Sequence, residues 1–306
     1  MIVTKTAASL LSLAALAASQ FHPVISPELS RGQIAGGLVN HMKQTNGRAE
    51  NWGDGWIYES CKREAQMRGY NPHDIEVFNV FYEDCHEPWI MCRHRGVSSP
   101  TKAEMVEEKR FGKLPLRTRQ YIRHVNVFPD LGNGAAGLFY DYNIMFGNGY
   151  MDLYILIHEA SHALDYAARA QDIGSPFSGT SVWQNAYRSD SRAPTGYART
   201  NWQEAYAEVG PLGFYEKHVP GGLINIQPNT HQIRNQLNTY VGYLGWGIEY
   251  NLGWCDSRMP NTPPVPMSNS FRVTDMADKP DVSIKSENVT VLDFPEAPRI
   301  VDDHIH

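Results

Sequence analysis

Basic residues are not in excess in this sequence. Its 306 residues include 27 lysines and arginines against 33 aspartates and glutamates, so the formal net charge at pH 7 is -6. Proteins that bind nucleic acid need a basic surface, because they neutralise the phosphates of the backbone. We therefore expect no nucleic-acid partner.

Long hydrophobic runs are scarce as well. The most apolar stretch beyond the first twenty residues, 153–170, is interrupted by two histidines and two acidic residues. A membrane-spanning helix needs about 20 predominantly apolar residues. The sequence therefore predicts no membrane span.

A short apolar run lies near the N-terminus. Lys5 precedes the segment Ala7–Ala18, and the small residues Ala17-Ala18-Ser19 offer a cleavage site. A positive start, a short apolar segment and small residues are together typical of a secretory signal peptide. We expect residues 1–19 to be a signal peptide and the mature protein to be secreted and extracellular.

Cysteine is rare. The four cysteines are Cys61, Cys85, Cys92 and Cys255, and none forms a Cys-x-x-Cys pair. This spacing argues against a structural zinc site made of cysteines. An even number in an exported chain instead favours two disulfide bonds, for which three pairings are possible. One hypothesis is a local Cys85–Cys92 bridge, which leaves Cys61 to pair with Cys255.

Internal repeats of a fixed period are absent, which argues against solenoid and propeller architectures. With 42% hydrophobic residues, the chain can form one large core.

Four prolines between residues 260 and 266 mark the start of a polar C-terminal segment. We predict one domain over residues 20–259, with a motif core at 151–217, and a Pro-rich, extended tail over 260–306. Asn288-Val289-Thr290 in this tail is an acceptor sequence for N-glycosylation.

Hydrophobic periodicity predicts the elements of an α+β domain. We expect strands at 75–82, 89–92, 122–128 and 137–146, and helices at 56–68, 101–110, 151–170 and 230–244. A further helix begins near Thr200-Asn201, and we expect Pro211 and Gly213 to limit it. The Gly- and Ser-rich segment 173–197 is expected to be a loop.

The segment His158-Glu159-Ala160-Ser161-His162 matches the pattern HExxH within the strongest predicted helix. Residues four apart lie on one helix face, about 6 Å apart, so the two imidazoles can share a metal ion. Catalytic zinc typically has three protein ligands and leaves one position for water. Glu159 can accept a proton from the water that attacks a carbonyl and pass it to the leaving amine.

The third ligand must come from elsewhere in the chain. Glu204 and Glu208 lie one turn apart on the next predicted helix, where one carboxylate can bind the metal and the other can support it. Such a pair also suits a solvated helix face. The longer pattern HExxHxxGxxH is excluded, because Asp165 and Ala168 stand where it requires glycine and histidine. Asp190 is a further candidate ligand.

Two motifs, His158-Glu159-x-x-His162-Ala163-Leu164-Asp165 and Tyr197-Ala198-Arg199-Thr200-Asn201-x-x-Glu204-x-x-Ala207-Glu208, carry a family resemblance. Together they resemble the catalytic domain of anthrax-toxin lethal factor, a gluzincin zinc metallopeptidase. The resemblance covers residues 157–215. It implies a zinc ion held by His158, His162 and Glu204, with Glu159 as the base and Tyr197 as a donor to the developing oxyanion. Asp165 and Glu208 are candidates for orienting the ligands.

A looser resemblance connects the chain with secreted conidiation-specific proteins of fungi that share this motif pair. The chain departs from lethal factor, because it lacks the large receptor-engaging regions and has four cysteines and an export leader. Toxin delivery and the cleavage of kinases therefore do not carry over.

These features combine into one functional hypothesis with an alternative. The hypothesis is a secreted zinc metalloendopeptidase with a zincin-like domain, one catalytic zinc ion, and peptide or protein substrates. Such a domain would contain a small sheet, the HExxH helix and the downstream glutamate helix. The alternative is a non-catalytic secreted or cell-surface protein in which zinc fixes the fold or binds a partner.

Overall fold

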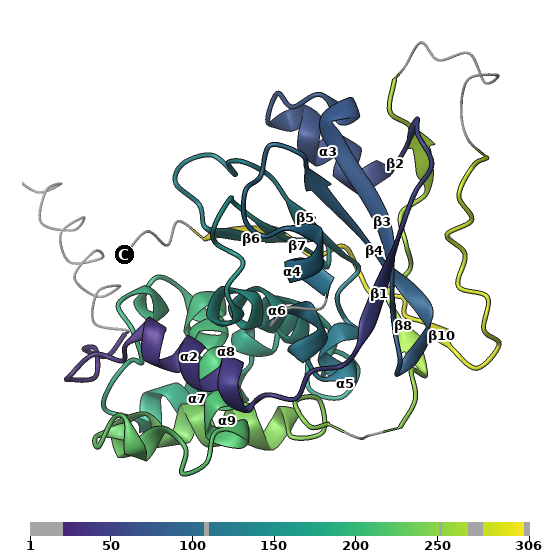
Figure 1. The fold of residues 1–306 in the computed structure, drawn as a ribbon. Coiled ribbons are helices and arrows are strands. Elements are labelled where there is room, and N and C mark those ends of the chain that lie inside the picture. The colour runs from purple at the N-terminus through teal and green to yellow at the C-terminus, as the bar shows by residue number, and fades with distance from the viewer. Residues whose placement is uncertain (1–20, 107–109, 251–252, 269–277, 303–306) are drawn as a thin grey trace, which may run out of the picture.

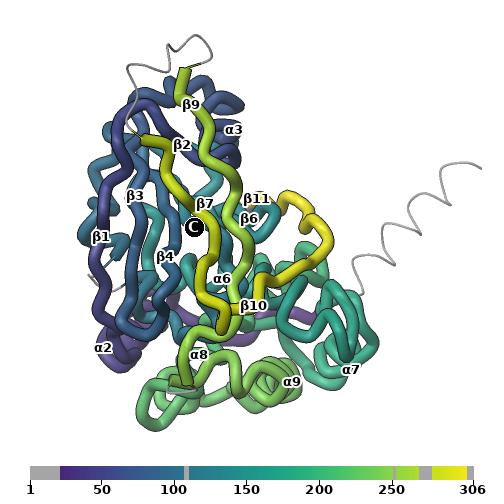
Figure 2. The backbone as a smooth tube through the Cα atoms, turned by 90° about the vertical axis from the view of Figure 1, so that its right-hand side faces the viewer, coloured from purple at the N-terminus to yellow at the C-terminus, as the bar shows by residue number. Residues whose placement is uncertain are grey.

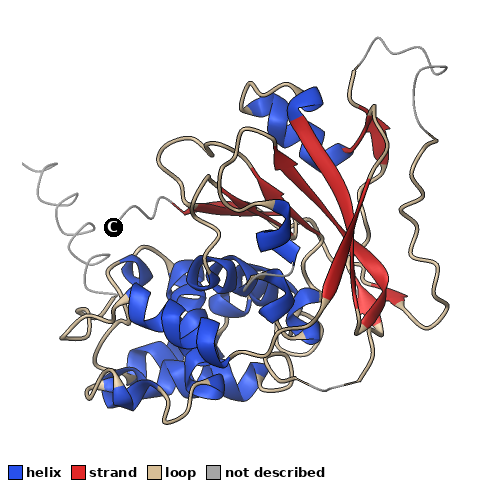
Figure 3. Ribbon diagram, in the orientation of Figure 1, coloured by secondary structure: helices blue, strands red, loops and turns tan. Residues whose placement is uncertain are grey.

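The structure is a computed structural model that describes residues 21–106, 110–250, 253–268 and 278–302. The expected signal peptide, residues 1–19, lies outside these ranges. A sheet stands against a layer of helices, which confirms the predicted mixed α+β class (Figures 1 and 3). Within the described ranges, none of the helices has both the length and the apolarity that crossing a bilayer requires.

A seven-stranded sheet forms one layer, in the order β1-β3-β4-β5-β7-β6-β11. β5 pairs in parallel with β4 and β7, and the other neighbours are antiparallel. The strands expected at 75–82, 89–92 and 122–128 correspond to β3, β4 and β5. The bounds are β1 Gly47–Asn51, β3 Ile75–Tyr82, β4 Cys85–His94, β5 His124–Val127, β6 Gly137–Tyr140, β7 Asn143–Phe146 and β11 Arg299–Asp302.

The single strand expected at 137–146 is instead the hairpin of β6 and β7. Asp141 and Tyr142 connect the two strands with φ values of 46° and 62°. Two consecutive positive φ values are typical of the tight turns that join antiparallel strands. The hairpin places β6 beyond β7, toward the edge of the sheet.

Side chains of the central strands alternate between two cores, as the period of a strand requires. Phe78 and Met91 face the helical layer, whereas their neighbours Val77 and Ile90 face the opposite side. Helix α3 (Glu59–Met67) covers this second side. The helix expected at 56–68 begins three residues later than predicted, because Trp56–Tyr58 form strand β2.

Helix α6 (Leu153–Ala167) lies at the centre of the helical layer. It packs against the sheet at β6 and against α8 (Trp202–His218), which also contacts α2 (Arg31–His41) and α9 (Arg234–Leu244). All residues of α6 except Tyr166 are buried, which explains why this helix is apolar around most of its circumference. The short helices α4 (Lys102–Val106) and α5 (Leu116–Arg119) precede it in the chain.

Helix α8 continues past the residues that were expected to limit it. Pro211 lies inside the helix, although proline removes one backbone hydrogen bond. A Cβ on Gly210 would lie 3.0 Å from Ser161 Cβ, and one on Gly213 would lie 2.5 Å from Tyr240 Cδ1. The glycines therefore allow α8 to approach α6 and α9 closely, and this packing stabilises a helix that local propensity would end.

The segment 173–197, expected to be a loop, contains helix α7 (Ser181–Ser189). Trp183 and Tyr187 lie one turn apart on α7 and are fully buried. The Trp183 ring contacts that of Tyr206 on α8, with 5.1 Å between centroids. Tertiary packing of these aromatic residues outweighs the loop-like composition around them.

The disulfide bonds are Cys61–Cys92 and Cys85–Cys255, so the hypothesis of a Cys85–Cys92 bridge is wrong. Cys85 and Cys92 both belong to β4. Seven residues of a strand span roughly 23 Å, and an odd separation turns the two side chains to opposite faces. A disulfide needs Cα atoms within about 7 Å.

Three segments of the predicted C-terminal tail pair with the domain. β9 (Pro264–Pro266) pairs with β2, and β10 (Thr290–Val291) pairs with β8 (Ser257–Arg258). β11 pairs with β6 and completes the sheet. The tail thus returns along the sheet toward the helical layer (Figure 2). Asn288 of the glycosylation sequence is exposed.

Candidate metal centre

Helix α6 positions the two histidines of the HExxH motif. Asp152 caps its N-terminus, because its carboxylate accepts a hydrogen bond from Ile155 N at 2.9 Å. His158 and His162 are buried, and their ring centroids lie 5.0 Å apart. The ring of Phe139 on β6 lies 5.9 Å from that of His162. The motif therefore faces the interior where α6, α8 and the sheet meet.

Helix α8 adds the third side chain. Asn201 caps this helix by accepting a hydrogen bond from Glu204 N at 2.9 Å, so Glu204 lies in the first turn. Glu204 Oε2 lies 3.2 Å from His158 Nε2 and 3.6 Å from His162 Nε2. One ligand atom from each of the three buried residues lies within 4.8 Å of the other two.

This geometry fits zinc. Ligands at about 2.0–2.1 Å from a tetrahedral ion lie roughly 3.3 Å from one another, and the two measured nitrogen–oxygen distances lie on either side of that value. Two imidazoles and one carboxylate are also a common ligand set for catalytic zinc. The three residues predicted as ligands thus lie together in one buried cluster.

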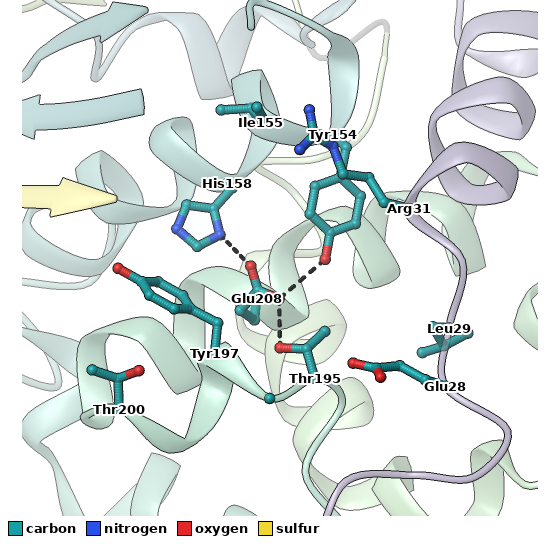
Figure 4. Close-up of a pocket in the computed structure, with 11 residues that line it drawn as sticks. Glu28, Leu29, Arg31, Tyr154, Ile155, His158, Thr195, Tyr197, Thr200 and Glu208 are labelled. Atoms are coloured by element: carbon teal, nitrogen blue, oxygen red, sulfur yellow. Dashed lines mark hydrogen bonds and ion pairs between the residues drawn. The ribbon is translucent and has the colours of Figure 1, made fainter. Parts of the chain in front are cut away.

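Glu208 orients the first histidine. Its Oε1 lies 2.8 Å from His158 Nδ1, and its Oε2 accepts hydrogen bonds from Tyr154 at 3.1 Å and from Thr195 at 2.6 Å (Figure 4). Burial first, and then the neighbouring Glu208 carboxylate, raise the pKa of Tyr154 well above its usual value, so this phenol remains a donor. A carboxylate on the outer nitrogen leaves His158 Nε2 available for metal and increases its basicity.

Asp165 is the other acidic residue predicted to support the ligands. It is fully buried, and its carboxylate accepts hydrogen bonds from Ser178 N at 2.6 Å and Ser178 Oγ at 2.7 Å. Burial raises the pKa of Asp165 to about 7, against the opposing effect of these two donors. Asp165 therefore connects α6 to the segment before α7.

Glu159 occupies a space that a glycine leaves for it. Its side chain is fully buried and extends toward β6, where a Cβ on Gly137 would lie 2.8 Å from Glu159 Cδ and closer still to Oε1. Any larger residue at this position would displace the carboxylate. Glu159 follows His158 directly on α6, which also carries His162.

Tyr197 lies beside His158, with 6.3 Å between ring centroids. It comes from a 3-10 turn, Tyr197–Arg199, that precedes α8. Thr195 Oγ1 accepts a hydrogen bond from Ala198 N at 3.1 Å, which fixes this turn to Glu208. The Tyr197 hydroxyl donates to the carbonyl of Val301 on β11 at 3.4 Å.

A cavity of about 440 Å³ opens beside the centre on the Glu208 side of His158. Figure 4 shows His158, Tyr197 and Glu208 on one wall and Glu28, Leu29 and Arg31 on the other. Arg31 pairs with Asp152 at the start of α6. The cavity gives access to the histidine side of the centre.

Asp190, the alternative ligand, lies elsewhere. Its carboxylate accepts hydrogen bonds from Asn235 N at 2.9 Å and Gln236 N at 2.8 Å, in the first turn of α9. Sequence reasoning did not identify Tyr154, Thr195 or Gly137. Tyr154 lies one turn before His158 on α6, a spacing that could have indicated it, whereas Thr195 and Gly137 belong to other segments whose contacts the sequence does not specify.

The chain is similar to known proteins over the region that contains this site. The family model described as conidiation-specific protein Con-13 matches residues 31–257. Conidiation-specific protein 13 of Neurospora crassa is 31% identical over 195 residues, which are 63% of this chain and 55% of that protein. The alignment thus spans about half the length of this relative. The family match includes α6 and α8 and ends before β11.

Proposed function

Because this chain belongs to the family of conidiation-specific protein Con-13, whose name states no reaction, we propose its activity from the candidate centre. The proposal is a secreted zinc metalloendopeptidase with a zincin-like domain that acts on peptide or protein substrates. The two disulfide bonds are compatible with an oxidising, extracellular location.

One observation carries the proposal: a buried His158–His162–Glu204 cluster in which the buried Glu159 directly follows the ligand His158 on α6. A metal that only stabilises a fold has no use for a base at its side. Glu159, whose carboxylate has the space that Gly137 leaves, is instead a group of the kind that accepts and delivers protons. The lethal factor resemblance of the two motifs supports the same assignment.

In this proposal His158, His162 and Glu204 hold the zinc ion. Zinc, when bound, supplies Lewis acidity that polarises a carbonyl and lowers the pKa of water. Glu159 accepts a proton from the attacking water and delivers it to the departing amine. Tyr197 donates a hydrogen bond to the carbonyl oxygen as negative charge develops there. Glu208 keeps the His158 ring in the tautomer that can bind metal.

The alternative function is a secreted protein in which zinc has a structural role. The burial of the ligand cluster, and the strand β11 that lies beside it, favour this alternative. The two functions differ in what Glu159 does, because only a peptidase requires its carboxylate.

The test is the Glu159→Gln variant, with zinc content measured beside cleavage of a mixed peptide library. We expect about one zinc ion per chain in both proteins and a loss of cleavage of about 10² to 10⁴-fold in the variant. Glu249→Gln is a matched control, since Glu249 forms a partly exposed ion pair with Lys217 away from the centre. Full cleavage by Glu159→Gln, or zinc binding without chelator-sensitive cleavage by any form, would reject the peptidase proposal.

A further inference from the structure

Strand β11 lies along the sheet edge that borders the candidate centre. It pairs antiparallel with β6, with Val301 opposite Leu138 and Asp302 opposite Gly137. Gly137 is the residue against which Glu159 lies. The strand that contacts the candidate base is β6, and β11 is its direct neighbour (Figures 1 and 2). Neighbouring strands in a sheet are about 4.8 Å apart.

Tyr197 contacts the same strand from the helical side. Its hydroxyl donates to the main-chain carbonyl of Val301 at 3.4 Å. In the proposed reaction this phenol would donate to the carbonyl of a substrate. A peptide carbonyl of the chain itself therefore lies within reach of the group that would recognise a substrate carbonyl.

We infer that the edge of β6 opposite β7 is the docking surface for an extended peptide, and that β11 is an internal occupant which such a peptide must displace. Unpaired N–H and C=O groups at a sheet edge bind extended peptides by strand addition. Because β11 already pairs with these groups, the chain is self-inhibited while β11 is in place. The inhibition rests on the proposed peptidase function, whereas peptide docking at β6 does not require hydrolysis.

The contacts of β11 suit a strand that can be released. It has four residues, and so short a strand contributes little pairing. Arg299 anchors its start, because Arg299 Nη1 lies 3.0 Å from Glu64 Oε2 and the guanidinium lies over the Tyr140 ring at 4.6 Å. Val301 remains 40% exposed. Besides the pairing with β6, the ion pair and the ring contact hold Arg299, and the Tyr197 hydrogen bond holds Val301.

Two variants of this chain loosen β11 in different ways. Ile300→Pro/Val301→Pro removes two consecutive backbone N–H groups, of which one faces β6 in an antiparallel ladder. Arg299→Ala removes the anchor and leaves the backbone unchanged, so it serves if the double variant does not fold. Ile284→Pro is the control, since residue 284 lies in an extended part of the tail outside any strand.

The probe is a fluorescein-labelled peptide with the sequence of residues 297–302, Ala-Pro-Arg-Ile-Val-Asp, which has no histidine to bind metal. Its affinity is measured by fluorescence anisotropy, with and without zinc. We expect binding to both loosened variants that is at least about tenfold tighter than to the wild type and Ile284→Pro, because the tethered competitor is gone.

Cleavage of a mixed peptide library by the same proteins separates this inference from the proposed function. Tighter probe binding without cleavage by any zinc-loaded form would support docking at β6 and reject the peptidase. Equal probe affinity for the wild type and both loosened variants would overturn the inference, whether or not the wild type cleaves peptides.

Discussion

Gly137 of β6 and Glu159 of α6 share a space that only a glycine can leave open. A Cβ at residue 137 would lie 2.8 Å from Glu159 Cδ and 3.1 Å from its Cγ. The far end of the glutamate would have to rotate away, while the backbone of β6 could keep its pairing with β7. This contact therefore couples a strand residue to the position of the candidate base.

Gly137→Ala should reduce peptide cleavage by about 10²-fold while the zinc content stays near one per chain, since a misplacement of about 1 Å can have an effect of this size. Gly36→Ala on α2 is the matched control, because a Cβ there meets no atom within 4 Å. The control should retain its activity and have an equal or slightly higher melting temperature. Normal cleavage by Gly137→Ala would show that the position of Glu159 does not matter.

His162→Ala and Glu204→Ala should each lose zinc. The wild type should melt at a higher temperature with zinc than with chelator, because a ligand that binds the folded state stabilises it. Each variant should melt at the same temperature under both conditions. His231→Ala, at an exposed histidine of the same helical layer, should behave as the wild type. A zinc-dependent shift that survives in both variants would place the metal elsewhere.

Glu208→Gln should weaken zinc binding by about 10 to 100-fold, because the amide is a poorer acceptor for His158 Nδ1–H than a carboxylate. Competition with a chromophoric chelator measures this affinity. Thr195→Val removes a single donor to Glu208 and should have a smaller effect. Glu216→Gln, two turns further along α8 and paired with Arg234, is the control. Equal affinities for all three variants would reject the orienting role of Glu208.

Acid should release β11. Burial raises the pKa of Glu64, but hydrogen bonds from Arg299 and Arg68 and the charges of both outweigh it, so the pKa is lowered overall. A carboxyl group whose pKa is lower in the folded state stabilises that state. This stabilisation is complete above the unfolded-state pKa of about 4.3, and it is lost as the pH falls through the folded-state pKa. Arg63, at 3.8 Å, also faces this carboxylate.

A probe with alanine in place of arginine cannot itself pair with Glu64, so its binding to the wild type should rise below about pH 4.3 as Glu64 becomes protonated. Arg299→Ala, which has already lost the anchor, should bind the probe with little change over the same range. Anisotropy titrations between neutral and acid pH compare the two proteins. A flat profile for the wild type would show that the ion pair does not hold β11.

The sequence predicts the site best where its residues lie close together along the chain. Residues His158 and His162 share a helix, so their spacing alone predicted that they face one another, and Glu204 followed from a second helical motif. Gly137 and Thr195 could not be predicted, because their roles depend on which segments the fold brings together. The same reason explains the wrong disulfide hypothesis, since the strand β4 separates Cys85 from Cys92.

Helices α7 and α8 show that local composition alone does not predict where a helix forms or ends. Pro211 and Gly213 predict a helix end, and a Gly- and Ser-rich segment predicts a loop. Both expectations failed, because buried contacts of Trp183 and Gly210 with neighbouring helices outweigh local propensity. Helix propensity depends on each residue and its neighbours in the sequence, whereas packing depends on contacts between helices that are distant in the sequence.

The Cys85–Cys255 bond has a consequence for how long any release of β11 could last. It fixes the chain just before the tail to the sheet, and the β8–β10 pair holds the tail again before β11 begins. A strand that leaves β6 thus remains nearby at an effective concentration that is millimolar for short flexible linkers. A separate inhibitor would be lost on dilution, whereas this tethered segment returns as soon as a weak competitor departs.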